Sequence, residues 1–373
     1  MKIVFATGIY PPELGGPASY THGMARAFCD RGDQVVVVCY GDENTVRDEG
    51  WPVEVVSRSG GVFMRYLRYA YHVWQQARQA DVVYVQGPVS EGVPGTLGAW
   101  IAGKKTVMKI VGDYAWEIYQ QTTKEPDLLD EFLLTRHRGT IGLLERLERM
   151  TAQRAQAIIT PSRYLKSVVE QWGIASDRIH VIYNGVDPLP VVAPREALRE
   201  RFGVLDNRVL LTAVRAVPWK GVDFLIDILA QLPPQVLLVV AGDGPSLEGW
   251  KQKAKALHLE DRVRWLGRVD RKTLTEWYSS ADVFLLASAY EGFPHVIAEA
   301  VAVGLPCFVT DKAGNPETKE LFPQQVTVLP YRDVNGWTEA LQQPSTLAHP
   351  MIGQSFVGMM QETDRVIKTV CVS

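Results

Sequence analysis

Arg215 and Lys220 have the side chains and the spacing to bind a diphosphate. They lie five residues apart in VRAVPWKG, directly after the apolar run at residues 208–213. A guanidinium fork and an ammonium on one proline-containing loop can converge on a diphosphate and neutralise the charge that grows as it departs. Two solvated surface cations would give the same pattern. Their place just beyond a predicted strand favours the anion site.

Two glutamates in SAYEGFPHVIAEAVAVGLP form a second candidate site. Glu291 lies in a turn after the run DVFLLA, and Glu299 follows eight residues later on a helix predicted to begin near His295. They would not share a helical face as a paired acid and base. Glu299 could accept hydrogen bonds from two ribose hydroxyls, although both glutamates could also be ordinary surface residues. Backbone N–H groups at Phe293, His295 and Val296 are expected to point towards an anion, with the positive helix end behind them.

A glycine pair, Gly15 and Gly16, precedes a predicted helix in TGIYPPELGGPASYTHG, where Pro17 and Ser19 mark the helix start. Glycines let backbone N–H groups approach a phosphate without a Cβ in the way. The third glycine of a dinucleotide fingerprint is missing and no P-loop lysine follows, so an ordinary tight loop fits equally well.

These residues need a scaffold, and the rest of the chain predicts one of the α/β class. Short runs rich in Val and Ile alternate with longer amphipathic segments, which is typical of βα units around a parallel sheet covered on both faces. Helices in the first half are predicted at 17–31, 62–79, 128–153 and 162–172. Strands are predicted at 2–6, 34–40, 53–56, 81–86, 105–111, 156–160, 179–182, 208–213, 236–241, 262–266, 282–287, 306–310 and 325–329. Two doubly wound domains follow.

The domain boundary is expected in NGVDPLPVVAP, residues 184–194, which has three prolines and no helical period. A chain of 373 residues is long enough for two domains. We therefore expect domains at 1–186 and 187–353, followed by a terminal helix within 354–373.

Composition and charge exclude several classes of protein. The chain has 39 basic and 42 acidic side chains, so it carries no global field for nucleic acid or an anionic membrane. Its four cysteines include no CxxC pair and no histidine cluster, which argues against a zinc site. Glu91 interrupts the longest uncharged run, near residues 82–103, and the apolar start MKIVFA is too short for a signal peptide. A cytoplasmic protein is expected.

Taken in this order, the three loops resemble the retaining glycosyltransferases of family four, which have the GT-B fold of two facing Rossmann-like domains. Glu291 and Glu299, with seven residues between them, are the most specific mark. The resemblance extends over nearly the whole chain and includes YPPELGGPASY, PSRYLKSVVEQWGI, VIYNGVD, VPWKGVDFLID, AGDGP, RVRWLGRV, ADVFLLASAYEGFPHVIAEAVAVGLP and the final helix, which is expected to cross back to the first domain.

The resemblance implies a role for each motif. Domain 187–353 would bind the donor, with Arg215 and Lys220 on its diphosphate. Glu291 would contact the transferred sugar and Glu299 the ribose. The donor phosphates and sugar would also meet backbone at Gly15, Gly16, Phe293, His295 and Val296.

Two positions depart from the family pattern. Many members have a His-Asp pair where this chain reads VGDYAWE, so only Asp113 is expected to face the sugar or the acceptor. Val214 precedes Arg215 where glycine is common, so the approach of that loop to phosphate is expected to differ.

The implied reaction moves a hexosyl unit from a UDP- or GDP-sugar to a hydroxyl of a saccharide or lipid-linked acceptor, as in polysaccharide biosynthesis, with retention of configuration. No Asp-x-Asp triplet exists to hold magnesium, so no metal and no cofactor beyond the donor is expected. Nucleic acid is not an expected partner.

The acceptor domain 1–186, together with the terminal helix 354–373, is the least family-like part. Segment 62–78 has three arginines, five aromatic residues and no acid, and segment 136–154 has five arginines. A basic aromatic helix can lie in a lipid headgroup region, yet the same residues can equally face the core. Peripheral membrane contact therefore remains open.

Three other functions also remain open. A nucleotide-sugar epimerase shares the fold but should offer an acid and a base in its cleft, and none is identifiable. A nicotinamide-dependent oxidoreductase would need GxGxxG, whereas GDGPSLEG has Leu247 at the third glycine position. A non-catalytic sugar-nucleotide binding protein is the third.

Overall fold

The computed structural model describes residues 1–13, 15–41, 49–124, 126–343, 347, 349–351 and 353–372. These residues divide into two units. The first comprises residues 1–126, 130–183 and 357–372, and the second comprises 127–129 and 184–356. The chain thus leaves the first unit after Tyr183, close to residue 186 where the domain boundary was expected. Ser373, the last residue of the predicted terminal segment, lies outside the described residues.

Seven parallel strands form the sheet of the first unit, in the order β3-β2-β1-β4-β5-β6-β7. The chain winds outwards from β1 to β3 and then returns to place β4 on the other side of β1. The topological switch point therefore lies between β1 and β4. The strands are β1 (Lys2–Thr7), β2 (Gln34–Gly41), β3 (Val53–Ser57), β4 (Val82–Gln86), β5 (Lys105–Lys109), β6 (Ala157–Thr160) and β7 (Ile179–Val181).

The helices of this unit differ from the prediction in two ways. The helix predicted over 128–153 is two helices, α5 and α6, separated at residues 135–138, and α3 and α4 were not predicted. One Pro and three Gly within GVPGTLGAWI obscure the helical pattern of α3. The helices are α1 (Gly16–Asp30), α2 (Val62–Ala77), α3 (Gly92–Ile101), α4 (Tyr114–Thr122), α5 (Leu129–Leu134), α6 (Gly139–Arg154), α7 (Arg163–Gln171) and α15 (Phe356–Val372), with a 3₁₀ turn η1 (Ser176–Arg178).

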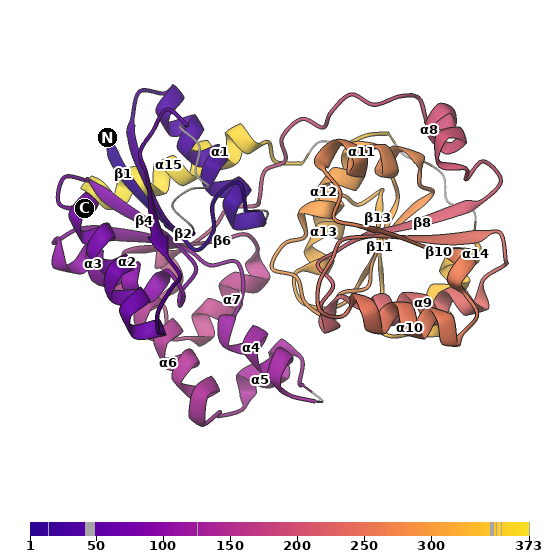
Figure 1. The fold of residues 1–373 in the computed structure, drawn as a ribbon, viewed down its shortest axis with the longest axis horizontal. Coiled ribbons are helices and arrows are strands. Elements are labelled where there is room, and N and C mark those ends of the chain that lie inside the picture. Colours follow the sequence, from indigo (N-terminus) through magenta and orange to yellow (C-terminus); the bar gives the residue numbers. More distant parts are fainter. Residues whose placement is uncertain are drawn as a thin grey trace. The chain divides into compact units, whose positions relative to one another are not determined.

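The terminal helix α15 packs on the first unit, alongside the N-terminal elements in Figure 1. Asp364 lies 2.6 Å from the guanidinium of Arg31 at the end of α1. Lys105 at the start of β5 donates to the Val370 carbonyl at 3.1 Å. The buried side chains of Met359 and Ile367 form part of its inner face. The expected return of this helix to the first domain is therefore present.

Six parallel strands form the sheet of the second unit, in the order β10-β9-β8-β11-β12-β13, so its switch point lies between β8 and β11. In Figure 1, α9 and α10 cover one face and α11 and α12 the other. The strands are β8 (Arg208–Ala213), β9 (Val236–Ala241), β10 (Val263–Gly267), β11 (Val283–Leu286), β12 (Cys307–Thr310) and β13 (Val326–Leu329). The helices are α8 (Arg195–Phe202), α9 (Val222–Gln231), α10 (Leu247–Ala256), α11 (Arg271–Ser280), α12 (His295–Ala302), α13 (Asn315–Leu321) and α14 (Val334–Gln342), with 3₁₀ turns η2 (Pro218–Lys220) and η3 (Glu260–Arg262).

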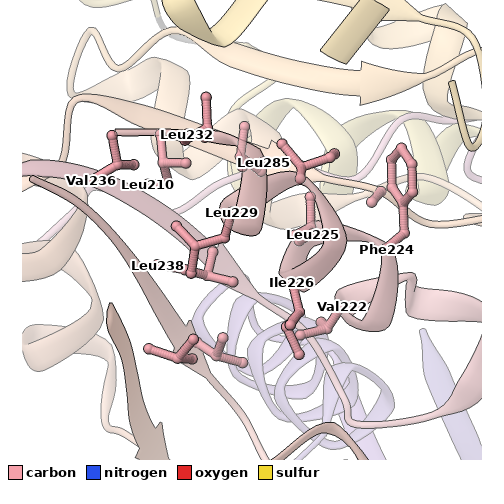
Figure 2. Packing of buried hydrophobic residues seen from close by; sticks show 14 of the residues in the cluster. Leu210, Val222, Phe224, Leu225, Ile226, Leu229, Leu232, Val236, Leu238 and Leu285 are labelled. Carbon is pink, nitrogen blue, oxygen red and sulfur yellow. The ribbon is translucent and has the colours of Figure 1, made fainter. Parts of the chain in front are cut away.

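The core beneath α9 fixes the loop that carries Lys220. Figure 2 shows Leu225 and Leu229 of α9 beside Leu210 of β8 and Leu238 of β9, and all four side chains are buried. Burial of each such side chain contributes about 1.5–3 kcal/mol. Because α9 begins two residues after Lys220, this packing holds the end of the loop in place.

Candidate functional site

Lys220 and Glu291 meet at the switch point of the second sheet, which we call the β8–β11 junction. The Lys220 ammonium lies 2.7 Å from Glu291 Oε1, and each side chain is only 14% exposed. The Ser288 hydroxyl donates to the same carboxylate oxygen at 2.7 Å. The loops after β8 and β11 are thereby joined by a charged hydrogen bond at the edge where ligands of α/β sheets bind.

A tight turn places Lys220 at this junction. The turn PWK ends at Gly221, whose φ of +68° lies in the left-handed region. A Cβ at this position would lie 2.3 Å from the Ala287 carbonyl oxygen, so a side chain has no room. The backbone N–H of Ala289 donates to the Trp219 carbonyl at 2.8 Å. Glycine is therefore required for the loop after β8 to approach the loop after β11.

Buried hydrogen bonds at the end of β12 hold the loop that carries Glu291. The Thr310 hydroxyl and the Asn315 amide both donate to the Ser288 carbonyl, at 2.6 and 3.1 Å. The Gly314 N–H donates to the Glu291 carbonyl at 3.1 Å. The glutamate is fixed from both sides, so the site is preorganised.

Arg215 lies on the same edge, at the exposed end of the loop after β8. Its guanidinium stands 5.7 Å from the centre of the Trp219 ring. The backbone before it, at Val214, runs so close to Gly242 that a Cβ on that glycine would lie 1.8 Å from the Val214 carbonyl oxygen. At this position the close approach is made by Gly242 of the neighbouring loop.

Glu299 has partners of its own, on α11. The Tyr278 hydroxyl donates to Glu299 Oε2 at 3.1 Å, and the Arg271 Nε lies 4.0 Å from Oε1. Burial raises the pKa of Glu299, while the Tyr278 hydrogen bond and the Arg271 charge oppose that rise. The two glutamates are therefore held separately, as their spacing predicted.

The helix that carries Glu299 begins at His295, as expected. Pro294 stands at the N-cap, and its side chain makes no capping hydrogen bond. Phe293 is buried, Val296 is half-buried and His295 is exposed. The positive end of α12 therefore follows Glu291 on the same edge of the sheet.

The glycine pair of the first unit begins α1, because Gly15 is the N-cap and Gly16 the first helical residue. A Cβ at Gly15 would lie 2.7 Å from the end of the Ile9 side chain, whereas one at Gly16 would meet nothing within 4 Å. Gly15 thus meets only the movable end of a side chain, and Gly16 meets nothing, so packing within the described chain requires neither glycine.

Asp113 caps α4 and is only 1% exposed. Its carboxylate accepts from the Trp116 N–H at 2.8 Å, and burial raises the pKa of Asp113 to about 7. Glu148 of α6, also buried, accepts from the Tyr114 N–H at 2.6 Å. Burial and the nearby Asp113 carboxyl raise the pKa of Glu148. The structure thus places both carboxyls at the buried start of α4.

Sequence reasoning treated Glu91 only as an interruption of an uncharged run. The structure places it after β4, at the switch point of the first sheet, which we call the β1–β4 junction. A Cβ at Gly8 would lie 2.9 Å from Glu91 Oε2, and a Cβ at Gly87 would lie 2.7 Å from Oε1. The sequence carried no signal for this position, because nothing in it shows that Glu91 lies at the end of β1 as well as of β4.

Two negative findings hold for the described residues alone. They contain no cluster of three or more His, Cys, Asp or Glu side chains that could hold a metal ion. Their helices include none that is long and apolar enough to cross a bilayer.

Comparison with protein families identifies both halves of the chain. Residues 14–188 match the model described as Glycosyltransferase Family 4, and residues 194–343 match the model described as Glycosyl transferases group 1. Only the two ends and residues 189–193 fall outside these matches.

Curated relatives include several sugar-transferring enzymes. The chain is 32% identical over 217 residues to mannosylfructose-phosphate synthase of Agrobacterium fabrum, covering 53% of the chain and 46% of that enzyme. It is 33% identical over 207 residues to D-inositol 3-phosphate glycosyltransferase of Xylanimonas cellulosilytica, covering 52% of the chain and 49% of that enzyme. The chain therefore spans about half the length of these relatives. A longer match, 23% identical, covers 87% of the chain and 74% of alpha-monoglucosyldiacylglycerol synthase of Streptococcus pneumoniae.

Solved structures show the same fold. HepE of Anabaena, in complex with UDP and glucose, superposes with a TM-score of 0.80 at 23% identity, covering 99% of this chain and 100% of HepE. Sucrose-phosphate synthase of Thermosynechococcus elongatus gives a TM-score of 0.74 at 18% identity, with coverage of 100% and 96%. With two Rossmann-like sheets and both family models matched, the chain belongs to the glycosyltransferases of family four and has the GT-B fold.

Proposed function

We propose that this protein transfers a hexosyl group from a nucleoside diphosphate sugar to a hydroxyl group, with retention of the anomeric configuration. The observation that carries this proposal is the β8–β11 junction, where Lys220 and Glu291 lie 2.7 Å apart beside Arg215. A fixed cation next to a fixed carboxylate suits a ligand with an anionic half and a hydroxylated half. A nucleoside diphosphate sugar has both.

In this proposal the cations act on the leaving group. Because Glu291 neutralises Lys220, the net positive charge of the junction comes from Arg215 and the N-terminus of α12. Arg215 and Lys220 bind the diphosphate, and Glu291 orients the sugar through its hydroxyls. These donors are in place before the reaction and stabilise the charge that grows on the phosphate oxygens.

The bond changes balance without a separate base. The bond from the anomeric carbon to the phosphate oxygen breaks, and a bond to the acceptor oxygen forms on the same face. The acceptor proton passes to the leaving phosphate oxygen. The loop backbone at Phe293, His295 and Val296 binds the sugar and pyrophosphate, Glu299 binds the ribose, and Gly15 and Gly16 approach the donor phosphates. Asp113 acts by fixing the start of α4.

A membrane-proximal, lipid-linked saccharide is the acceptor class that the surface of the first unit favours. Helix α3 packs closely on α2, since a Cβ at Gly98 would lie 2.5 Å from the Ala70 carbonyl oxygen. The outer side of this pair carries exposed apolar side chains, Phe63 at 73% and Trp100 at 69% among them. Residues 62–79 contain three arginines and no acid, which suits an anionic headgroup region.

Vesicle sedimentation tests this surface. Wild-type protein is expected to pellet with phosphatidylglycerol vesicles and to stay in solution with phosphatidylcholine vesicles. Replacing Phe63 and Trp100 together by Ser should abolish pelleting without changing donor binding. Equal pelleting of the double variant would remove the membrane surface from the proposal.

A thermal-shift panel of UDP-, GDP- and ADP-sugars, with magnesium and with EDTA, tests the donor. A donor that binds the native protein raises its melting temperature. The expected result is a shift for one base and one sugar, unchanged by EDTA. The anomeric configuration of the product, read by NMR, then tests retention. If no nucleotide sugar shifts the melting temperature, the proposal fails.

The donor that the thermal-shift panel identifies also distinguishes the proposed transferase from the alternative functions. An epimerase would convert it without an acceptor, and NMR of the donor alone would reveal the new sugar. A non-catalytic binding protein would show the thermal shift but neither transfer nor slow hydrolysis of the donor.

A further inference from the structure

At the β1–β4 junction of the first unit lies the carboxyl group of Glu91, which no side chain of the described residues pairs with. Glu91 stands at the N-cap position of α3, yet its side chain makes no capping hydrogen bond. Its two oxygens lie instead over Gly8 and Gly87, where a Cβ would approach within 2.9 and 2.7 Å. These two glycines end β1 and β4, so the carboxyl group lies at the switch point of this sheet, where ligands of such sheets bind.

Three tyrosines lie near this carboxyl group, Tyr40, Tyr66 and Tyr69. The Arg65 guanidinium lies 5.5 Å from the centre of the Tyr40 ring and 5.8 Å from that of Tyr66. The Tyr40 hydroxyl donates a hydrogen bond to the Ser90 carbonyl at 3.0 Å, and the Tyr66 side chain is half-buried. Burial chiefly raises the pKa of Tyr66, and the nearby Glu91 adds to that rise. The carboxyl group therefore shares a partly open, aromatic environment.

No lysine or arginine in the described part of the chain lies within ion-pair distance of the Glu91 carboxyl group. Although the residue keeps some exposed surface, burial raises the pKa of Glu91 to about 8. At neutral pH the group is mostly protonated, so it can both donate and accept a hydrogen bond. Whenever the Glu91 carboxyl group ionises, it repels an anion beside it. The site therefore disfavours a phosphate and favours a hydroxyl group.

We propose that Glu91 binds the acceptor of the transfer reaction, by hydrogen bonding to hydroxyl groups of a saccharide held at the β1–β4 junction against Tyr66. The inference rests on the proposed function and adds to it the residue that recognises the second substrate. Glu91 is distinct from the cations of the second unit, which bind the donor.

Four variants test the role of Glu91, with methyl α-glucoside, methyl α-mannoside and methyl α-galactoside as probes. Glu91→Ala removes the carboxyl group. Glu91→Gln keeps a donor and an acceptor of the same size. Gly8→Ala leaves Glu91 in place but pushes its carboxyl group aside, because the new Cβ meets only the end of that side chain. Glu54→Ala removes another carboxylate of the same unit, on β3, as the control.

Saturation-transfer NMR is expected to show at least one methyl hexoside bound to the wild-type protein and to Glu54→Ala. Glu91→Ala should lose this signal, Gly8→Ala should weaken it, and Glu91→Gln should retain it. In the transfer assay, Glu91→Ala should raise the acceptor KM about tenfold or more, equivalent to one lost hydrogen bond to a polar group. Donor hydrolysis in water and the donor thermal shift should stay at wild-type values in all four variants.

Each contrary result has a distinct meaning. If no methyl hexoside binds the wild-type protein, or if Glu91→Ala binds and uses it normally, Glu91 is not an acceptor residue. If Glu91→Ala lowers donor hydrolysis as much as transfer, the role is structural and the inference fails. If the wild-type protein binds a methyl hexoside through Glu91 but binds no nucleotide sugar, the proposed function fails while the saccharide site stands.

Discussion

The two sheets place a glutamate at equivalent positions and give it opposite surroundings. Glu291 follows β11 at one switch point, and Glu91 follows β4 at the other. Glu291 is paired with Lys220 at 2.7 Å, whereas Glu91 lies over two glycines and among tyrosines. Within the chain as described, Glu91 has no such cation, and burial raises the pKa of its carboxyl group to about 8. One topology thus provides a charged site suited to a diphosphate and a neutral site suited to hydroxyls.

Lys220→Ala should have the largest effect, because it removes the charge that makes the β8–β11 junction different. We expect transfer to fall by about 10²–10³-fold, as when one preorganised donor to a developing oxyanion is lost. The far-ultraviolet circular dichroism should change little, since the lysine lies on a loop, while the melting temperature should fall because Glu291 loses its cation. Steady-state kinetics with the donor found by thermal shift measure the loss.

Lys253→Ala is the matched control, because Lys253 also pairs with a carboxylate of the second unit, Asp227, at 2.6 Å. It should retain wild-type turnover. If both lysine variants transfer sugar normally, the two junctions do not differ in the way we describe.

Gly221→Ala should have the next largest effect, on stability. The left-handed φ and the 2.3 Å approach to the Ala287 carbonyl leave no room for a methyl group. We expect a loss of about 2–3 kcal/mol in the free energy of unfolding, measured by urea denaturation. Gly249→Ala on α10, where a Cβ meets nothing within 4 Å, should be neutral or stabilising. Equal stability of the two variants would show that the junction does not depend on this close approach.

Glu299→Ala should weaken donor binding without abolishing transfer. The ribose hydroxyls would lose their hydrogen bonds to the Glu299 carboxylate, so the dissociation constant of the donor should rise about tenfold to a hundredfold. Isothermal titration calorimetry with the nucleoside diphosphate measures this change. An unchanged affinity would remove Glu299 from the donor site and leave its Tyr278 and Arg271 contacts as its whole role.

Asp113→Asn should have the smallest effect, seen in the pH dependence of stability. The pKa of Asp113 is raised from 3.8 to about 7, so the folded state holds a proton that the unfolded state releases. Stability should therefore fall as pH rises from about 4 to 7, and asparagine, which also caps helices, should reduce that slope. Melting temperatures at several pH values test this, with the exposed Asp177→Asn as control. If the slope is unchanged and transfer is lost instead, Asp113 contacts a substrate.

The scaffold could be predicted well from the sequence, because buried parallel strands leave continuous runs of Val and Ile. All thirteen predicted strands are present, each end within two residues of its expected place. Helix α3 was missed because its glycines serve close packing, as Gly98 does against α2 and Gly95 against the sheet, which only the tertiary structure reveals. The break between α5 and α6 was missed although residues 135–138 are all polar, because apolar residues on both sides of them were assigned to one helix.

The candidate site was predictable in its residues but not in its pairings. Arg215, Lys220 and Glu291 each follow a strand, which the sequence reveals. That Lys220 pairs with Glu291 depends on strand order, because β8 and β11 are neighbours in space and not in sequence. The burial of the acids in the first unit was not predictable either. Asp113 and Glu91 look like any other acid in the sequence, and only the fold shows that both are enclosed.

The docking of α15 has a consequence for biosynthesis. The chain leaves the first unit after Tyr183, forms the whole second unit, and returns only at residue 357. Buried side chains such as Met359 and Ile367, and the Asp364 pair with Arg31, are therefore missing from the first unit until the whole second unit has been synthesised. The unit that emerges from the ribosome first would thus be the last to be completed, and it would expose that apolar surface to chaperones while its partner folds.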